Sequence, residues 1–500
     1  MRKLKELFQF MPGICDEKRS EKELNHLVYD SRKAEKNDVF VALKGSKTDS
    51  HQYIPDLLKK GVYIVAENGL ALPHENIFFV EDTRKALALL SKAYFHHPDK
   101  DLFIVGITGT NGKTTTTYMI RSILAVMGIK TGIIGTIQYL IGDESIKAEN
   151  TTPESYEIFK MFHEMKEKGC KAVAMEISSH ALSMSRVYGI DLDMAVFTNL
   201  TQDHLDYHKT FEEYLKAKLQ IFTLLSKSSK EKKMALINRD IPEFEELKKS
   251  LSINHLPYQT YGIHYPADWQ GISSSMNIYH NLFHILYEKK DYSIDTPMLG
   301  FFNIYNALTA AAAAVFFGAD PNSVEAGLKE VEVKGRFERV ENSLGFGVII
   351  DYAHTPDALE NVLKTAQALN PINIITVFGA GGDRDKGKRP LMGKAALKYS
   401  SFVILTSDNP RSEDPLSIIQ DIEKAFDNKE LYSVFIDREK AVEKAIDMAE
   451  EGDLVIIAGK GHEEYQIFKD ETVHFSDRES ALRYIRLKEE KKKKNKFLLY

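Results

Sequence analysis

Apolar runs alternate with amphipathic stretches along most of this chain, and the alternation predicts strands and helices in regular succession. Between residues 101 and 335, apolar runs such as "DLFIVGIT" and "CKAVAMEIS" are separated by helical patterns such as "PESYEIFKMFHEMKEKG". Apolar strands that alternate with amphipathic helices are typical of a parallel sheet covered on both faces. This part of the chain is therefore predicted to be an α/β domain built on such a sheet.

The pattern changes near residues 100 and 335. Before the first position the strand-like runs are short, and a helical pattern, "TRKALALLSKAYFHH", stops at Pro98. After the second, a new alternation begins with "GVIIDYAH", "NIITVFGAGG" and "DLVIIAGKG". The fold class that follows is α/β with three domains and a tail. They are a smaller N-terminal α/β domain (1–100), a central P-loop-type parallel-sheet domain (101–335), a C-terminal Rossmann-like doubly wound domain (336–487) and a basic tail (488–500).

Composition narrows the class of protein without naming a function. Of the 500 residues, 28% are charged and 43% hydrophobic, and the net charge is -6, as in ordinary globular proteins. Two distant cysteines, Cys15 and Cys170, fit a reducing cytoplasm better than a disulfide framework. Neither a signal peptide nor an apolar run of roughly 18 residues is evident. We expect a cytoplasmic monomer without nucleic-acid or membrane partners, and a solvated, frayed tail around the lysine run at 491–494, since aromatic interleaving is absent.

The stretch "GITGTNGKTTTT" (106–117) is a glycine-rich loop with unusual spacing. Gly106 leaves five residues before Gly112, whereas the common phosphate loop has four. The loop joins a predicted strand to a predicted helix, where unpaired N–H groups and the helix dipole attract anions. Lys113 adds a mobile positive charge, and Thr114 offers a hydroxyl to magnesium. These features favour a phosphate loop of a different class over a turn that binds nothing.

Two further side chains are expected at the same sheet edge. Glu176 ends one predicted strand, and His204 follows another. A dication beside a triphosphate typically takes carboxylate and hydroxyl ligands, and histidine is an unusual addition. Alone, His204 is typical of a hydrogen-bonded structural histidine, but beside Glu176 and the loop a metal role is the better interpretation. Taken alone, the amphipathic pattern "FEEYLKAKLQIF" predicts that Lys218 lies on a helix with its aliphatic stem on the apolar surface and its ammonium group in solvent.

Polar loops follow three strands in the last third of the chain. The loop "GAGGDRDKGKRP" carries Arg384 and Arg389 and is able to cover an anion. In "SDNPRSEDP", Pro410 stiffens the turn that holds Arg411, an arrangement suited to bidentate carboxylate recognition. In "AGKGHEEYQ", Glu463 is able to pair with an ammonium group. Each loop alone fits a solvated surface equally well, but together they predict a pocket for an amino acid.

In this order along the chain, the motifs resemble those of the muramyl ligases, ATP-dependent enzymes that add amino acids to peptidoglycan precursors. The loop of that family, GTNGKT/S, has the spacing seen here. The resemblance extends to about residue 485. It implies that the N-terminal domain binds the UDP-linked substrate, the central domain binds ATP and the C-terminal domain binds the amino acid. It includes "DSR" (30–32), "NTTP" (150–153), "EISSHAL" (176–182), "NLTQDHLDYH" (199–208), "GRFE" (335–338), "DYAHTPD" (351–357), "GGDRDKGKR" (381–389), "DNPR" (408–411) and "GKGHE" (459–463).

The resemblance implies roles for the residues of the ATP site. ATP is expected at Thr108, Gly109, Thr110, Asn111, Gly112, Lys113 and Thr114, with Asn303, Arg336 and Asp351 along its base and ribose. The implied catalytic residues are Lys113, Glu176, His204 and Lys218. The implied magnesium ligands are Thr114, Glu176, His204 and a carbamate that Lys218 forms with carbon dioxide.

The resemblance also implies two further binding sites. A UDP-muramoyl-dipeptide is expected at Tyr29, Ser31, Asn150, Thr151, Thr152, Ser178 and Arg186. Where the family often has glutamine, two residues before Arg186, this chain has Met184. Meso-diaminopimelate is expected at Arg384, Asp408, Asn409, Pro410, Arg411, Gly459 and Glu463.

The implied reaction is ATP-dependent amide formation through an acyl phosphate, in the cytoplasmic synthesis of the cell wall. The expected substrates are ATP, the UDP-muramoyl-dipeptide and meso-diaminopimelate. Diaminopimelate differs from lysine by a second carboxylate at its far end, and Arg411 is a suitable partner for it. The alternatives are a lysine-adding member of the family, a ligase of the folylpolyglutamate synthetase type, and an ATP-driven conformational switch.

Overall fold

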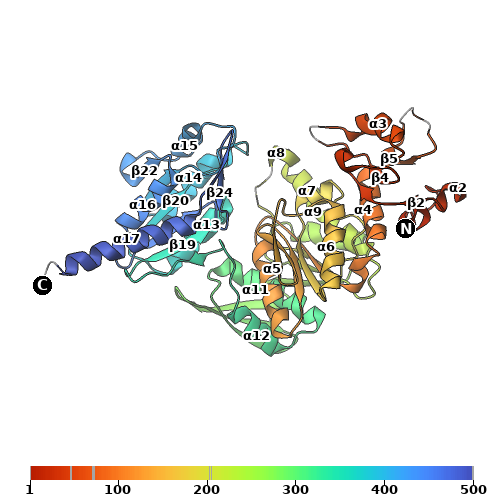
Figure 1. The fold of residues 1–500 in the computed structure, drawn as a ribbon. Coiled ribbons are helices and arrows are strands. Elements are labelled where there is room, and N and C mark those ends of the chain that lie inside the picture. Colours follow the sequence, from red (N-terminus) through yellow and green to blue (C-terminus); the bar gives the residue numbers. More distant parts are fainter. Residues whose placement is uncertain are drawn as a thin grey trace.

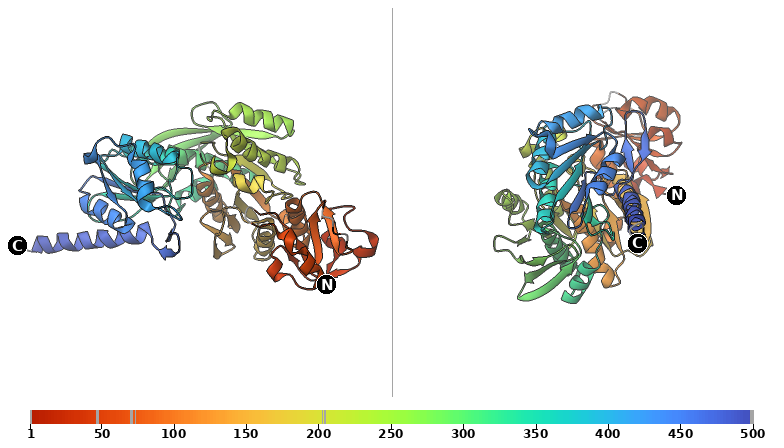
Figure 2. Two further views of the ribbon diagram at one scale, coloured as in Figure 1. Left: turned by 90° about the horizontal axis from the view of Figure 1, so that it is seen from above. Right: turned by 90° about the vertical axis from the view of Figure 1, so that its left-hand side faces the viewer.

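Three α/β units follow one another along the chain and lie in a row, with the N-terminal unit at one end and the C-terminal unit at the other (Figures 1 and 2). The computed structural model describes residues 2–45, 48–69, 72, 74–201, 203 and 205–497. Each unit contains its own sheet, so the predicted α/β class with three domains is confirmed. The divisions near residues 100 and 335 remain proposals.

The N-terminal unit contains a four-stranded parallel sheet in the order β3-β4-β5-β6. Asp82 caps the last helix of this unit, α4, by accepting hydrogen bonds from the backbone N–H groups of Arg84 and Lys85. The helix α4 packs against α6 of the central unit. The elements are β1 Arg2–Lys3, α1 Leu4–Leu7, α2 Glu17–Ser20, β2 Glu23–Leu24, β3 Leu27–Val28, η1 Ser31–Lys33, β4 Val39–Val41, η2 Ser50–Tyr53, α3 Ile54–Lys59, β5 Tyr63–Glu67, β6 Ile77–Val80, α4 Thr83–Tyr94 and η3 Pro98–Asp101.

The central unit contains a sheet of eleven strands in the order β10-β9-β8-β11-β7-β12-β13-β14-β15-β16-β17. The elements from the phosphate loop to α9 are β7 Phe103–Thr108, α5 Lys113–Val126, β8 Thr131–Ile134, β9 Gln138–Ile141, β10 Glu144–Lys147, α6 Ser155–Glu167, β11 Ala172–Glu176, α7 Ser179–Ser183, β12 Met194–Phe197, α8 Leu205–His208 and α9 Phe211–Ser226. The others are β13 Met234–Asn238, α10 Phe244–Ile253, β14 Tyr258–Gly262, β15 Trp269–Met276, β16 Asn281–Tyr287, β17 Lys290–Thr296, α11 Phe301–Phe317 and α12 Pro321–Lys329.

This sheet is mixed, and that corrects the expectation of a purely parallel one. The seven adjacent strands β8-β11-β7-β12-β13-β14-β15 are parallel to one another. At the two edges of the sheet, β9, β10, β16 and β17 pair antiparallel with their neighbours. The predicted strands β7, β8, β11, β12 and β13 are confirmed as continuous apolar runs. In β16 and β17 buried and less buried positions alternate, because one face packs on the core and the other faces solvent. Because polar residues alternate with apolar ones, β16 and β17 lack the continuous apolar runs from which the parallel sheet was predicted.

The C-terminal unit contains a six-stranded sheet in the order β18-β19-β23-β20-β21-β22, parallel except for β18. The elements are β18 Glu338–Arg339, β19 Gly347–Asp351, α13 Pro356–Ala368, β20 Ile374–Phe378, α14 Lys388–Tyr399, β21 Phe402–Thr406, α15 Pro415–Glu423, η4 Lys429–Leu431, β22 Tyr432–Phe435, α16 Arg438–Met448, β23 Leu454–Ala458, β24 Tyr465–Ile467, β25 Thr472–His474 and α17 Asp477–Phe497.

The lysine run at 491–494 is helical, which corrects the expectation of a frayed tail. These lysines belong to the last turns of α17 and are exposed to solvent, as expected. Among the described residues, none of the helices combines the length and the apolar content that a membrane-spanning helix needs.

Candidate active site

The glycine-rich loop follows the central strand β7 and leads into α5, as its sequence predicts. Two of its glycines have positive φ angles, 142° at Gly109 and 87° at Gly112. A Cβ atom on Gly109 would lie 1.9 Å from the Thr198 hydroxyl, and one on Gly112 would lie 2.3 Å from the Asn306 side-chain oxygen. The loop therefore needs glycine at both positions, both for its backbone conformation and for its close contact with neighbouring segments.

Two lysine side chains converge on this loop. The Nζ atoms of Lys113 and Lys218 both donate to the carbonyl oxygen of Gly109, at 2.9 and 2.8 Å. Lys218 is only 2% exposed, and its Nζ lies 4.5 Å from the centre of the Tyr214 ring. Burial, together with the positive charge of Lys113, lowers the pKa of Lys218 well below its ordinary value. The lowered pKa favours the neutral form of the Lys218 amine. The helical pattern of the sequence predicts instead a lysine whose ammonium group is solvated.

A chain of oxygen atoms connects the loop to the interior of the molecule. The Thr114 hydroxyl donates to Oε1 of Glu176 at 2.9 Å. The same carboxylate accepts from the Thr136 backbone N–H at 2.8 Å and from its hydroxyl at 3.1 Å. The Thr136 hydroxyl also lies 3.1 Å from that of Thr151. A buried carboxylate therefore joins the loop to a residue expected to bind the dipeptide substrate.

This oxygen chain fits a hard cation. Thr114 and Glu176 present a hydroxyl and a carboxylate beside a loop suited to phosphates, which is the ligand set that magnesium prefers. Magnesium keeps several waters and substrate oxygens, so few protein ligands suffice. Within the described parts of the chain, no group of three or more histidine, cysteine or acidic residues could hold a metal. His204, a further predicted ligand, lies outside the described residues.

The residues expected along the nucleotide differ in what they contact. Arg336 reaches the phosphate loop, where its Nη2 donates to the Thr114 hydroxyl at 3.2 Å. Asn303 donates to the carbonyl of Leu299 and accepts from the side chain of Asn306 at 2.8 Å. Asn306 was not predicted, although its N-x-x-N spacing from Asn303 places both on one face of α11.

Asp351 is held by the backbone of its own domain. Its Oδ2 accepts from the N–H of Phe337 and its Oδ1 from that of Ala353, each at 2.7 Å. Burial raises the pKa of this carboxyl group, against the opposing effect of Arg336.

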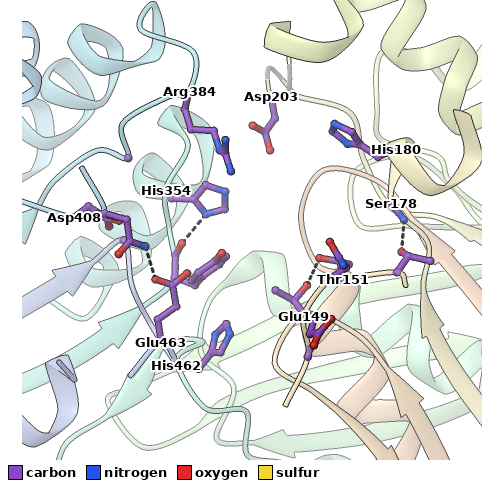
Figure 3. Close-up of a pocket in the computed structure, with 18 of the residues that line it drawn as sticks. Glu149, Thr151, Ser178, His180, Asp203, His354, Arg384, Asp408, His462 and Glu463 are labelled. Carbon is purple, nitrogen blue, oxygen red and sulfur yellow. Dashed lines mark hydrogen bonds between the residues drawn. The ribbon is translucent and has the colours of Figure 1, made fainter. Parts of the chain in front are cut away.

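A cavity of about 480 Å³ separates the central and C-terminal units, and side chains of both units line it (Figure 3). From the central unit come the predicted residues Asn150, Thr151, Thr152, Ser178 and Arg186, together with Met184. From the C-terminal unit come the predicted residues Arg384, Asp408, Asn409, Arg411, Gly459 and Glu463. Two groups of residues that the sequence separates by about two hundred positions thus face one another.

Three of the residues predicted for the dipeptide and diaminopimelate sites lie outside the lining of this cavity. They are Tyr29, Ser31 and Pro410. Tyr29 belongs to the N-terminal unit, and its hydroxyl donates to Oε1 of Glu157 on α6 at 2.8 Å.

The central wall is held in place by backbone contacts. The Thr152 hydroxyl donates to the carbonyl of Glu176 at 2.9 Å and accepts from the Ser178 N–H at 3.0 Å. The guanidinium of Arg186 donates to the carbonyl of Thr152 at 3.0 Å and pairs with Glu154 at 2.8 Å. These bonds order the "NTTP" and "EISSHAL" segments against each other and set the shape of this wall.

On the opposite wall, backbone carbonyls hold Arg411. Its Nη1 donates to the carbonyl of Gly382 at 2.8 Å and to that of Asn409 at 3.3 Å. Its backbone N–H donates to Ile467, and its φ angle is 53°, in the left-handed region. A guanidinium held through one nitrogen keeps its other donors for a ligand, which fits the predicted carboxylate site.

The predicted ammonium partner, Glu463, already has two partners in the protein. Its Oε2 accepts from the Asn409 amide at 2.9 Å and from Lys460 Nζ at 2.8 Å. Lys460 is fully buried, so this ion pair fixes the direction of the carboxylate. The backbone of Gly459 packs closely against Asp408, since a Cβ atom on Gly459 would lie 2.7 Å from Oδ2 of Asp408.

Of the two arginines in the segment that follows β20, Arg384 in the loop and Arg389 in the first turn of α14, only one lines the cavity. Arg384 lines it, and Figure 3 shows its side chain opposite Asp203 of the central unit. Arg389 is instead 1% exposed and pairs with Glu413 at 2.8 Å and Asp421 at 2.9 Å. Its hydrogen bonds lower the pKa of Glu413 to about 2. Arg389 therefore holds α14 and α15 together and does not cover an anion, which corrects the sequence-based expectation.

Several cavity residues went unpredicted, although all of them except Thr136 lie within the quoted segments. They are Thr136, His180, Asp203, Tyr352, His354, Asp385, Lys388, His462 and Tyr465. Nδ1 of His354 lies 2.9 Å from the carbonyl of Tyr352 and must donate to it, which leaves Nε2 as the acceptor of the neutral ring. Burial lowers the pKa of His354, and it lowers that of His462 to about 3. Both imidazoles are thus neutral near pH 7.

The phosphate loop also contacts the C-terminal unit directly. The side-chain amide of Asn111 donates to Oδ2 of Asp357 at 2.9 Å. Together with the bond from Arg336 to Thr114, this contact holds the loop, the cavity and the C-terminal sheet in one assembly.

Comparison with known families matches two segments of the chain. The Mur ligase middle domain matches residues 107–314. The Mur ligase glutamate ligase domain matches residues 335–461. The two segments contain the phosphate loop from Ile107 onward and most of the residues that line the cavity.

Similar proteins cover nearly the whole chain. A UDP-N-acetylmuramoyl-L-alanyl-D-glutamate--2,6-diaminopimelate ligase of Syntrophomonas wolfei is 43% identical over 93% of this chain and 95% of its own. A solved structure of a ligase of the same name is 30% identical, with a TM-score of 0.72, and covers 98% of this chain and 99% of its own. A folylpolyglutamate synthase of Mycobacterium tuberculosis is 18% identical, with a TM-score of 0.63, over 75% of this chain and 92% of its own, and shares the fold alone.

Proposed function

This chain belongs to the Mur ligase family, and we propose that it uses ATP to join meso-2,6-diaminopimelate to UDP-N-acetylmuramoyl-L-alanyl-D-glutamate in cytoplasmic peptidoglycan precursor synthesis. The observation that carries the proposal is the cavity between the central and C-terminal units. One wall holds five of the seven residues expected to bind the muramoyl dipeptide, and the other presents a fixed arginine and a carboxylate. The phosphate loop is connected to the first wall through Glu176 and Thr136.

The proposed reaction begins with activation of the carboxylate. An oxygen of the D-glutamyl γ-carboxylate attacks the γ-phosphorus of ATP, the bond from that phosphorus to the ADP oxygen breaks, and an acyl phosphate forms. The amine of diaminopimelate attacks the acyl carbon, and the tetrahedral intermediate collapses to an amide as phosphate leaves and the amine loses a proton. Positioning and charge neutralisation dominate such phosphoryl transfers. Lys113 offsets the negative charge of the two anions that must meet.

Magnesium belongs to this proposal as a counter-ion for the phosphates. Thr114 and Glu176 would hold it, and His204 is a further proposed ligand. When bound, the ion neutralises charge that develops on the phosphate oxygens. The protein itself orients Glu176, since the backbone N–H and the hydroxyl of Thr136 donate hydrogen bonds to its two carboxylate oxygens and fix the orientation of the group.

We further propose that Lys218 carries a carbamate. Its amine is 2% exposed, lies against the phosphate loop and has a lowered pKa, so its neutral form is available to attack carbon dioxide. A nitrogen–carbon bond forms, the amine nitrogen loses a proton, and an anion replaces a neutral amine beside Lys113. That change supplies a buried negative charge where a magnesium ligand is needed.

Arg411 supports diaminopimelate as the amino acid. The guanidinium is held at the cavity wall by two carbonyls, and it retains donors for the second carboxylate of diaminopimelate. Lysine has no such carboxylate and would leave those donors unpaired. Glu463 and Asn409 form a polar surface suited to the ammonium group at the same end.

The direct test is phosphate release from ATP in the presence of the UDP-muramoyl-dipeptide. We expect release with meso-diaminopimelate and little release with L-lysine or with no amino acid. Equal release in all three reactions would refute a ligase and point to an ATP-driven switch. Release with lysine alone would keep the ligase and reject the assignment of Arg411.

The variant Arg411→Gln tests whether Arg411 selects diaminopimelate over lysine. It removes the charge of the carboxylate partner, so kcat/KM for diaminopimelate should fall roughly 100-fold, equivalent to about 3 kcal/mol, while the small rate with lysine should hardly change. Arg239→Gln, an arginine outside the cavity that packs on Phe244, is the matched control and should keep full activity.

A further inference from the structure

Lys388 places a buried positive charge at the wall of the cavity. It is the first residue of α14, and its side chain lines the cavity although the residue is only 6% exposed. No hydrogen bond or ion pair joins its ammonium group to another residue in the part of the chain that the structure describes. By contrast, Lys460, which is also buried in this domain, pairs with Glu463 at 2.8 Å.

This arrangement is unfavourable for the protein on its own. A buried charge without a partner costs stability, and the first turn of a helix is a poor position for a cation because the helix dipole is positive there. Burial lowers the pKa of Lys388, against the opposing effects of Asp203, Asp408 and Asp385. An anionic ligand beside Lys388 would remove both penalties, so we expect its partner to be a substrate.

The first turn of α14 lies at the edge of the C-terminal sheet that contacts the phosphate loop. The helices α13 and α14 pack against each other, and they follow β19 and β20, which belong to the parallel part of the sheet. Their first turns therefore lie at the same edge. In the first turn of α13, Asp357 accepts from the side chain of Asn111 in the phosphate loop at 2.9 Å. Lys388 thus enters the cavity beside this contact.

An aspartate of the central unit lies near both Lys388 and the lysines of the phosphate loop. Asp203 lines the cavity, and Figure 3 shows it facing the C-terminal wall. Burial lowers the pKa of Lys113, Lys218 and Lys388, and the negative charge of this aspartate opposes the effect at all three. Because such effects weaken with distance, the three lysines approach one region from two units.

The anion that passes through this region is the phosphoryl group. The second carboxylate of diaminopimelate already has Arg411 as a partner, at a separate loop of the C-terminal wall. The γ-phosphoryl group, in contrast, leaves the phosphate loop and moves to a carboxylate in the cavity. We propose that Lys388 binds an oxygen of this group during its transfer and in the acyl phosphate that results. This inference rests on the ligase reaction proposed above and adds a catalytic residue to it.

The transfer step requires no proton. An oxygen of the D-glutamyl γ-carboxylate forms a bond to the γ-phosphorus as the bond from that phosphorus to the ADP oxygen breaks. The negative charge of the group lies on its three other oxygens. The ammonium group of Lys388 donates a hydrogen bond to one of them from the C-terminal side, whereas Lys113 acts from the loop. Loss of one such donor slows a reaction about 100-fold or more.

The variant Lys388→Met tests this role, since it replaces the ammonium group by an apolar side chain of similar length. Phosphoryl transfer alone is followed without an amino acid, as exchange of label from ADP into ATP in the presence of the UDP-muramoyl-dipeptide. We expect this exchange and kcat for ligation both to fall about 100-fold, while KM for meso-diaminopimelate changes less than about 2-fold. The variant should unfold at a higher urea concentration than the unchanged chain, because an unpaired buried charge is removed.

Other outcomes would overturn the inference. A rise in KM for diaminopimelate with an unchanged exchange rate would assign Lys388 to a carboxylate of the amino acid. Unfolding at a lower urea concentration would show that the lysine supports the fold. Normal ligation by Lys388→Met would exclude any catalytic role.

The matched control is Lys394→Met. Lys394 lies on the same helix, is exposed and lies outside the lining of the cavity, so this variant should keep both rates. The unchanged chain separates the two levels of the proposal. If it forms no amide, the proposed function fails. If it forms the amide and Lys388→Met forms it equally fast, the function stands and only the role of Lys388 fails.

Discussion

The variant Lys113→Ala is expected to form the amide at least about 1,000-fold more slowly than the unchanged enzyme. The Nζ atom of Lys113 donates to two carbonyls of its own loop, at Gly109 and Thr110, and so lies above the surface where phosphates are expected to bind. Two anions must come together there, and removal of the mobile cation leaves their repulsion uncompensated. The measurement is ADP formation with all three substrates present.

The loss should come from chemistry and not from unfolding. Lys113 is a half-buried residue at the start of α5, and alanine is a favourable residue within a helix. The variant should therefore unfold at nearly the same urea concentration as the unchanged chain. Lys130→Ala, at an exposed position on the same domain, should keep its rate. Near-normal turnover by Lys113→Ala would contradict the assignment of the loop.

Replacing Lys218 by alanine is expected to lower the rate by about 100-fold or more, because a buried carbamate would be lost from the magnesium site. With ¹³C-labelled bicarbonate, the unchanged protein should show one carbamate carbon signal that Lys218→Ala lacks. Removal of carbon dioxide from the buffer should slow the unchanged enzyme. If the labelled protein gave no such signal while fully active, the carbamate would be excluded.

The variant Lys218→Arg separates charge from carbamate chemistry. Arginine keeps a permanent positive charge and does not form a carbamate under these conditions. If Lys218 acted as a cation, arginine would preserve much of the activity. We expect instead that arginine is as damaging as alanine, because a second fixed cation beside Lys113 opposes the metal.

Much of the site could be predicted because glycine and charged residues follow apolar strands. The apolar sequences of β7, β11 and β12 predict where these strands end and therefore where the edge of the sheet lies. Gly109, Gly112 and Lys113 identify the loop that follows β7. Parallel strands bring such loops to one edge whatever lies between them in sequence. The C-terminal wall of the cavity was predicted in the same way, from motifs that each follow a strand, whereas the residues of the central wall were implied only by the resemblance to the muramyl ligases.

Other features depend on packing that sequence patterns do not record. Lys218 lies in a helical pattern and Arg389 in a polar loop sequence, and both patterns are typical of solvated residues. In the structure, Lys218 is buried against the phosphate loop and Arg389 between Glu413 and Asp421. Neighbours far away in sequence decide both outcomes. His354 and Lys388 lie within motifs but have no special spacing, so only the fold shows that they face the cavity.

The central claim is that the phosphate loop activates a carboxylate, and oxygen-isotope transfer tests it most directly. The γ-carboxylate of the D-glutamyl residue is labelled with ¹⁸O, and the phosphate released during ligation with meso-diaminopimelate is analysed by mass spectrometry. An acyl phosphate requires one labelled oxygen to leave with each phosphate, in proportion to the amide formed. Unlabelled phosphate alongside normal amide formation would show that the oxygen came from water and would contradict the account.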